Sequence, residues 1–271
     1  MADKLKSWIP NLFTLGNLLC GCIAIQYAYL QDFRMAALLV LAGAVLDFLD
    51  GFMARLLKVS SELGKQLDSL ADVVTFGVAP GIVVFNYFGY LHGLHQMNGW
   101  MQTIPSMVDS VPYVIALVAF AIPVFSAIRL AVFNLDKTQS DSFKGVPTPA
   151  CGMFFVFYCA CIFEFNFDSP GQRNQIDMEL NPSILNLFLN GWILVSLCVL
   201  FCLLMVSRLP LFALKFKSFG FKGNEIRYIF LTLALGMLII FQLRAIPLIV
   251  LLYILLSFII IPFNRKQQHE I

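Results

Sequence analysis

Residues 35–57 decide the fold: they read MAALLVLAGAVLDFLDGFMARLL, an apolar run that contains two aspartates. An α-helix needs about 20 mostly apolar residues to cross the hydrocarbon of a bilayer. Residues 67–90, LDSLADVVTFGVAPGIVVFNYFGY, form a second run of the same kind. Ionisable residues within membrane spans are costly and usually functional, so each run predicts a membrane helix that contributes to a site.

The composition of the whole chain indicates a polytopic membrane protein. Of its 271 residues, 59% are hydrophobic and 13% are charged, whereas a soluble domain carries about 25% charged residues. The last two apolar runs are separated by a short turn and predict a helical hairpin. The pattern as a whole predicts an all-α bundle of about eight transmembrane helices at residues 10–30, 35–57, 67–90, 111–133, 148–166, 184–206, 227–243 and 246–262.

We expect a single transmembrane domain over residues 1–271, with its core at about 8–206 and the extra C-terminal hairpin at about 227–262. The seven cysteines lie within apolar runs and form no C-x-x-C pair, which indicates packing residues and not a zinc site. The net charge of +2 is too small to indicate nucleic acid as a partner.

The distribution of positive charges predicts the orientation in the membrane, because cytoplasmic loops are enriched in Lys and Arg. Eight spans place both termini on one side, and that side collects 15 of the 18 Lys and Arg residues. The other side has the remaining three, Arg34, Arg173 and Arg244. We therefore expect a multi-pass protein of the cell membrane, with both termini and the loops at 58–66 and 134–146 in the cytoplasm.

Four aspartates lie on two neighbouring spans. Asp47 and Asp50 are three residues apart, and Asp68 and Asp72 are four apart, so each pair shares one face of its helix. A short turn makes the two helices antiparallel neighbours, and their acidic faces can meet. Four carboxylates in a low-dielectric site repel one another unless protons or cations intervene. Oxygen ligands favour hard ions, so we predict a site for two Mg²⁺, Mn²⁺ or Ca²⁺ ions that hold a phosphate or diphosphate.

Small residues beside the aspartates leave room for a bulky anionic ligand. Gly51 and Ala54 lie one turn from the aspartates, and Gly64 opens the third span. Arg55 is the nearest cation and is placed to reach a phosphate oxygen. These residues predict a nucleotide close to the helix backbone.

A polar stripe at helical spacing lies on the first span and consists of Asn11, Thr14 and Asn17. Two interpretations stay open at this point. The side chains either contact the nucleotide or form hydrogen bonds to a neighbouring helix.

The acidic stretch has a recognisable pattern: Asp47-x-x-Asp50-Gly51-x-x-Ala54-Arg55, eight residues, Gly64, three residues, Asp68, three residues, Asp72. These eight fixed residues over 26 positions resemble the signature of the CDP-alcohol phosphotransferase family at every fixed position. The resemblance implies an enzyme that transfers a phospho-group from a CDP-activated lipid to a small alcohol. It also implies two divalent cations, a homodimer, and Ser69 as a further residue of the nucleotide site.

Four stretches resemble the serine-using branch of that family, the CDP-diacylglycerol–serine O-phosphatidyltransferases. The resemblance implies CDP-diacylglycerol and L-serine as substrates, with CMP released by direct attack. In that reaction Asp72 is the candidate general base for the serine hydroxyl. The four stretches are IPNLFTLGNLLCG at 9–21, LDSLADVVTFGVAP at 67–80, RLAVFN at 129–134 and FKGVPTPA at 143–150.

The last two of these stretches contain the candidate acceptor residues Arg129, Asn134 and Lys144. Arg129 and Lys144 can bind the carboxylate of serine or a donor phosphate, and Asn134 can orient the serine. The alternative for the two cations is anchoring at the membrane interface.

Two rival functions remain. Other branches of the family use glycerol phosphate, inositol phosphate or an amino alcohol, and a phosphorylated acceptor demands a denser basic cluster. A cation or proton transporter would place acids in several spans and show inverted repeats, whereas the acids here lie on one helix pair.

Overall fold

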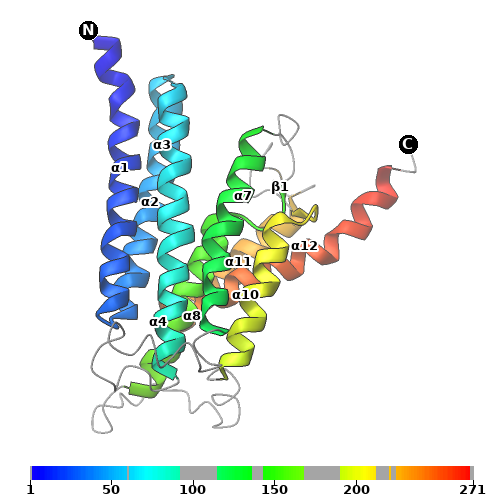
Figure 1. The fold of residues 1–271 in the computed structure, drawn as a ribbon. Helices are drawn as coiled ribbons and strands as arrows, with labels where there is room; N and C mark the ends of the chain where they lie inside the picture. The colour runs from blue at the N-terminus through cyan, green and yellow to red at the C-terminus, as the bar shows by residue number, and fades with distance from the viewer. Residues whose placement is uncertain are drawn as a thin grey trace.

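The computed structural model describes residues 2–59, 61–91, 115–135, 143–167, 190–211, 220 and 224–268. Within these ranges, only the backbone is described for residues 2–7, 143–144, 163–167, 210 and 259–268. The described chain is almost entirely helical (Figure 1). This confirms the all-α transmembrane fold. Two strands of two residues each, β1 (Phe143–Lys144) and β2 (Pro210–Leu211), were not predicted.

Three long helical segments form the N-terminal half. α1 (Ala2–Tyr29) and α2 (Phe33–Leu57) are followed by one continuous rod. The rod consists of α3 (Glu62–Asp72), a π-helical turn η1 (Val73–Val78) and α4 (Ala79–Leu91). In Figure 1 these segments stand side by side.

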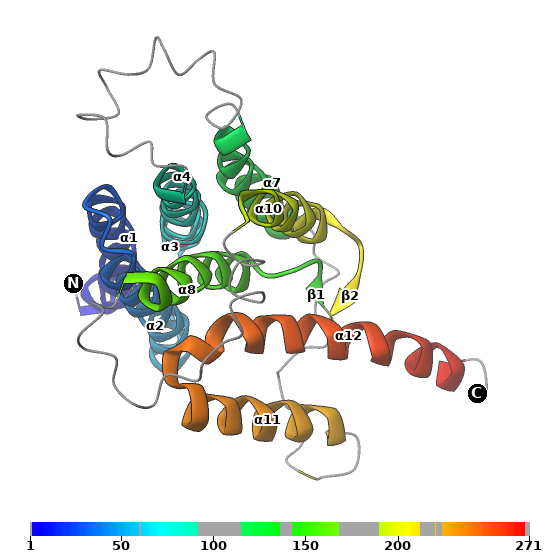
Figure 2. The same ribbon diagram turned by 90° about the horizontal axis from the view of Figure 1, so that it is seen from below.

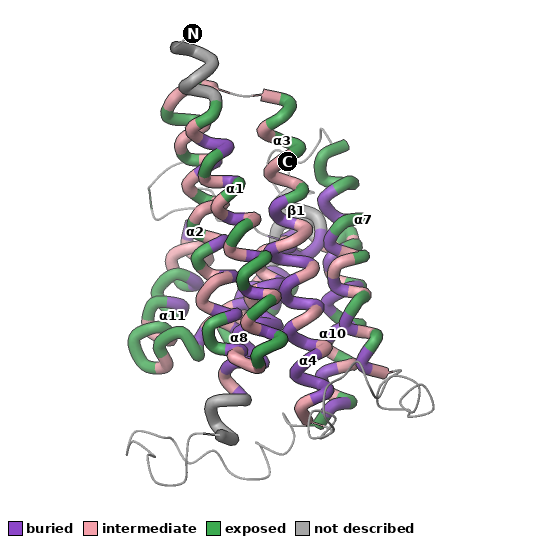
Figure 3. Tube along the Cα trace, turned by 60° about the vertical axis from the view of Figure 1, so that its left-hand side comes forward, coloured by how far each residue is buried: buried purple, intermediate pink, exposed green. Residues whose placement is uncertain are grey.

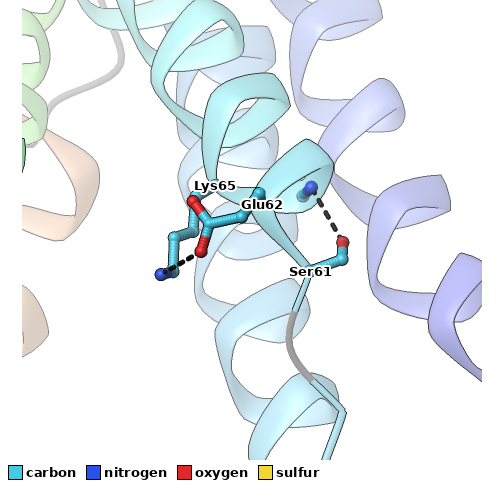
Figure 4. Close-up of polar contacts among 4 residues, drawn as sticks. Ser61, Glu62 and Lys65 are labelled. Atoms are coloured by element: carbon cyan, nitrogen blue, oxygen red, sulfur yellow. Dashed lines mark hydrogen bonds and ion pairs between the residues drawn. The ribbon is translucent and has the colours of Figure 1, made fainter.

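Local sequence explains where α2 and α3 begin and end. The Asp32 side chain accepts a hydrogen bond from the Met35 N–H at 2.9 Å and caps the start of α2. Lys58 ends the helix with a φ of 53°. The Ser61 hydroxyl then accepts a hydrogen bond from the Gly64 N–H at 2.9 Å and caps α3 (Figure 4). Because the turn between these caps is short, the acidic faces of α2 and α3 are brought together.

The C-terminal half is built from η3 (Leu117–Phe120), α7 (Ala121–Leu135), α8 (Thr148–Phe167), α10 (Gly191–Val206), α11 (Glu225–Phe241), η4 (Gln242–Ala245) and α12 (Ile246–Gln268). Figure 2 shows α11 and α12 lying side by side and crossing the direction of the other helices. The chain reverses between them at Gln242, where φ is 55°. The strand pair joins the segment before α8 to the segment after α10.

Five described helical segments are long and apolar enough to cross a membrane: Trp8–Tyr29, Phe33–Leu57, Glu62–Leu91, Leu117–Leu135 and Glu225–Phe258. Thr148–Ile162 and Gly191–Val206 are shorter apolar helices. The chain is therefore a multi-pass membrane protein. The count of eight spans stays a prediction, since 111–114 and 184–189 lie outside the described residues. The segment Glu225–Phe258 contains the expected span 227–243 and most of the expected span 246–262.

The buried side chains concentrate on the inner helices, and the exposed apolar ones lie on the outer faces (Figure 3). Phe154 of α8 stacks on Phe201 of α10 with ring centroids 4.3 Å apart. Phe48 and Phe52 of α2 are exposed, as residues in contact with lipid would be. Lipid tails are as apolar as these side chains, so close packing and hydrogen bonds hold such helices together.

Candidate active site

Three aspartates from two helices form an acidic cluster. Asp47 and Asp50 lie on α2 and Asp68 on α3, and one carboxylate oxygen from each lies within 4.8 Å of the others. Asp50 is buried, and the other two are partly buried. Three carboxylates at this distance repel strongly without a cation between them, and an oxygen-only set suits a hard divalent ion. The cluster therefore has the chemistry of a metal site.

The fourth predicted ligand, Asp72, lies one helical turn further along the rod and is buried. Its Oδ1 atom accepts a hydrogen bond from the Asn17 amide at 3.3 Å. The structure thus places Asp72 beside the cluster, with one carboxylate oxygen engaged by α1. The other oxygen accepts no hydrogen bond from the described residues.

The first helix also contacts the cluster directly. The Thr14 hydroxyl donates to Asp50 Oδ2 at 2.5 Å and lies 3.2 Å from the Pro10 carbonyl. Thr14 was expected to contact either a nucleotide or a neighbouring helix. The structure shows the helix contact, and it is made to an aspartate of the acidic cluster.

A pocket adjoins the cluster where α1, α2 and the start of α3 meet. Five of the expected nucleotide residues line it: Asn11, Thr14, Gly51, Ala54 and Gly64. The other lining residues are Pro10, Asp50, Val59, Ser61, Lys65 and Asp68. The pocket therefore opens onto the carboxylates, as a site for a phosphorylated ligand must.

The two glycines of the pocket differ in what surrounds them. Apart from its own helix backbone, a Cβ on Gly51 would meet no heavy atom of the described residues within 4 Å, so the space there is open. A Cβ on Gly64 would lie 3.0 Å from both Asn11 Oδ1 and Ser61 Oγ. Gly64 thus allows α1 and the cap of α3 to approach closely, and Gly51 leaves room for a ligand.

Arg55 and Ser69 are not among the pocket-lining residues. Arg55 is exposed in the last turn of α2, where a cation also stabilises the helix C-terminus. The Ser69 hydroxyl donates to the Lys65 carbonyl at 3.1 Å and accepts from the Asn134 amide at 2.8 Å. Ser69 and Asn134, expected in two different subsites, therefore bind one another and join α3 to α7.

Arg129 is a buried cation on α7. One terminal nitrogen donates to the Thr148 hydroxyl of α8 at 3.1 Å, and the guanidinium carbon lies 5.9 Å from the centre of the Phe133 ring. Its buried Nε has no hydrogen-bond partner among the described residues. A buried guanidinium with an unused donor suits an anionic ligand. The side chain of Lys144 lies outside the described residues, and its backbone belongs to β1.

Comparison with known proteins decides the family. A model of the CDP-alcohol phosphatidyltransferases matches residues 7–203. The chain belongs to the CDP-alcohol phosphatidyltransferase family. The match includes the acidic cluster, the pocket and Arg129, and it ends before α11.

Several relatives carry the name CDP-diacylglycerol–serine O-phosphatidyltransferase. The Helicobacter pylori (strain J99) protein is 40% identical over 149 residues, 54% of this chain and 55% of the relative. The Bacillus subtilis protein is 32% identical over 162 residues, 60% and 78% of the two chains. The Saccharomyces cerevisiae protein is 33% identical over 177 residues, 60% and 56%. The alignment thus spans only about half of the first and third relatives.

Several residues of this CDP-alcohol phosphatidyltransferase site were not assigned from sequence. Ser61 and Lys65 line the pocket, and Lys65 forms an ion pair with Glu62 at 3.0 Å (Figure 4). A serine three residues before Gly64 is a typical helix cap, so local reasoning could have found Ser61. Thr148 holds Arg129 from another helix, and no sequence signal pairs the two.

Proposed function

We propose that this protein transfers the phosphatidyl group from CDP-diacylglycerol to L-serine and releases CMP. The observation that carries the proposal is the convergence of Asp47, Asp50 and Asp68 beside a pocket open to a phosphorylated ligand. The names of the relatives support serine as the acceptor. Membership of the CDP-alcohol phosphatidyltransferase family supports the CDP-linked donor.

The reaction requires one bond to form and one to break at phosphorus. The serine hydroxyl oxygen attacks the phosphorus that carries the diacylglycerol. The bond from that phosphorus to the bridging oxygen breaks, and the electron pair leaves with CMP. The hydroxyl proton passes to a base, for which the buried Asp72 carboxylate, with one oxygen left for the site, is our candidate. No covalent enzyme intermediate is needed.

The aspartates fit the divalent cations that this chemistry needs. We assign Asp47, Asp50, Asp68 and Asp72 as ligands of two Mg²⁺ or Mn²⁺ ions, and Ca²⁺ fits the same donors. When bound, such ions neutralise the charge that develops on the diphosphate and on the leaving CMP. Thr14 holds Asp50 by a hydrogen bond, and the pocket residues Asn11, Gly51, Ala54 and Gly64 surround the nucleotide.

The acceptor side is formed around Arg129. The unused Nε–H and the buried position of Arg129 support binding of the serine carboxylate. Asn134 and Lys144 complete the acceptor site in our proposal. Arg55 contributes to binding of the donor phosphate from outside the pocket wall, and Ser69 supports Asn134 through the hydrogen bond between them.

We place the protein in the cell membrane with the site facing the cytoplasm, because that side carries 15 of the 18 positive residues. Labelling of single cysteines tests this orientation. A cysteine at position 140 should react only from the cytoplasmic side, and one at position 106 only from the other side. Light scattering of the purified protein tests the expected homodimer.

The proposed activity is tested with purified protein, CDP-diacylglycerol, Mg²⁺ or Mn²⁺ and a panel of labelled alcohols. We expect phosphatidylserine and CMP in equal amounts from serine. Preference for glycerol 3-phosphate, inositol phosphate or an amino alcohol would reject serine and retain the family chemistry. Turnover in excess EDTA would reject the metal assignment.

A further inference from the structure

A buried polar junction lies directly beneath the acidic cluster and joins three helical segments. Asn17 of α1 and Thr75 of η1 are both fully buried. The Asn17 amide donates to Asp72 Oδ1 at 3.3 Å, and the Thr75 hydroxyl donates to the Asn17 carbonyl at 2.9 Å. Burying a polar side chain within a membrane span costs free energy unless the side chain is hydrogen-bonded. Polar residues retained in such a position are often functional. No role has been assigned to Thr75, and Asn17 has been identified only as part of the polar stripe on the first span.

The third segment restricts how Asn17 can be oriented. A Cβ on Gly43 of α2 would lie 2.8 Å from Asn17 Oδ1 and 2.7 Å from Thr75 Cγ2. Asn17 Oδ1 is therefore enclosed against the Gly43 backbone, where it has no hydrogen-bond partner among the described residues. The opposite orientation of the amide would direct its oxygen at the Asp72 carboxylate, and two acceptors repel. This repulsion leaves the amide N–H groups facing Asp72.

The position of this junction along the rod is informative. The helix changes from α to π hydrogen bonding immediately after Asp72. Turns of this kind are frequent at functional sites. Because the regular hydrogen-bond ladder is interrupted there, a contact from another helix can fix the rotation of the segment about its axis. The bond from Thr75 to α1 provides that contact, and a Cβ on Gly21 would lie only 2.8 Å from the Thr75 Cα.

We propose that Asn17 is a positioning residue for Asp72, and that Thr75 and Gly43 hold Asn17 in place. Asn17 occupies one carboxylate oxygen and turns the other toward the acidic cluster. The residue does not touch the reacting atoms in this assignment. The inference rests on the proposed function of the site, since it gives Asp72 a role in metal binding or proton transfer.

The test compares Asn17→Leu with a matched control, Asn86→Ala. Asn86 is also a buried asparagine of the same rod, and it donates to the Ile82 carbonyl of its own helix at 3.0 Å. It lies 14 residues beyond Asp72, roughly 20 Å away at 1.5 Å per residue. Asn17→Leu should lower kcat and weaken Mn²⁺ binding, measured by electron paramagnetic resonance, by about 10- to 100-fold. The KM values for CDP-diacylglycerol and serine should change by less than about threefold, because Asn17 contacts neither.

Several outcomes would overturn the proposal. Wild-type kcat and Mn²⁺ affinity in a folded Asn17→Leu protein would do so, as would an equal loss in Asn86→Ala. If Asn17→Leu does not fold, Thr75→Val and Thr75→Ser decide: only the valine variant should lose kcat, and equal activities would reject the junction. If wild-type protein transfers to no alcohol, the proposed function fails, whereas the Mn²⁺ titration still tests the effect of Asn17 on the site.

Discussion

The two sides of the site are built in different ways. The metal side uses residues 11–72, three consecutive helical segments joined by short turns, and its aspartates repeat at helical spacing. The acceptor side brings Arg129 of α7 to Thr148 of α8. The segment before α8 is in turn held by the segment after α10. One side follows from local geometry, and the other depends on contacts between distant parts of the chain.

The loop before α8 shows how strong that dependence is. The Gly145 N–H donates to the Leu209 carbonyl at 2.9 Å, and the Val146 N–H to the Leu204 carbonyl at 3.1 Å. Gly145 has a φ of 76°, and a Cβ there would lie 2.3 Å from the Met205 carbonyl oxygen. Only glycine fits this position. The acceptor side should therefore be sensitive to residues that touch no substrate.

The largest effect is expected from removing a charge of the acidic cluster. Asp47→Asn or Asp68→Asn should lower turnover by about 10³-fold, because a bound metal ion contributes several kcal/mol and about 1.4 kcal/mol is one decade. Initial rates with serine and Mn²⁺ measure this. The control is Asp32→Asn, because asparagine caps a helix as well as aspartate does. If a folded Asp68→Asn protein has a turnover within tenfold of wild type, the role of the acidic cluster in binding the metal ions is rejected.

The next effect concerns the acceptor side alone. Arg129→Ala should raise the KM for serine by about 10- to 100-fold, since a hydrogen bond to a charged group contributes about 1.5–3 kcal/mol. The KM for CDP-diacylglycerol should change much less. Arg129→Lys should recover part of the loss, because it keeps the charge without the planar donor set. If the KM for CDP-diacylglycerol rises instead, Arg129 is a phosphate ligand. The acceptor side and the metal side would then bind the same substrate.

A smaller effect is expected from the loop that supports Arg129. Gly145→Ala introduces backbone strain of about 1–3 kcal/mol, so it should lower kcat/KM for serine by roughly tenfold. The melting temperature should fall, and Mn²⁺ affinity should stay unchanged. Gly236→Ala is the control, since a Cβ there meets no heavy atom of the part of the chain that the structure describes within 4 Å, its own helix backbone aside. Loss of Mn²⁺ binding in Gly145→Ala would mean that the two sides are not independent.

The smallest effect is expected at the hydrogen bond that joins the two sides. Asn134→Ala and Ser69→Ala should each reduce kcat/KM by about threefold, as removal of one exposed neutral hydrogen bond does. The double variant should be no worse than either single one, because both remove the same bond. Ser196→Ala, which removes a hydroxyl bonded to its own helix, serves as control. Additive losses would show that the two residues act separately.

Much of the fold and of the metal side was predictable, because both follow from residue spacing within individual helices and from the short turns that join consecutive helices. Apolar runs of spanning length predicted the membrane helices, and the spacing of Asp47, Asp50 and Asp68 predicted their convergence. The strand pair β1–β2 was not predicted, since segments of two residues have no sequence pattern of their own. The pairing of Ser69 with Asn134 was missed because it joins residues 65 positions apart.

The sequence by itself determined that this is a helical membrane protein with a carboxylate cluster, because hydrophobic length and helical spacing are properties of short segments. Only the tertiary structure decided which partner each polar side chain has. Asn17 could have faced a ligand or a helix, and in the folded chain its amide donates to Asp72. Thr148 became the partner of Arg129 because α7 and α8 pack together. Within a membrane, the partner of a polar side chain depends on which helices pack together. The residue pattern within one helix does not specify that packing.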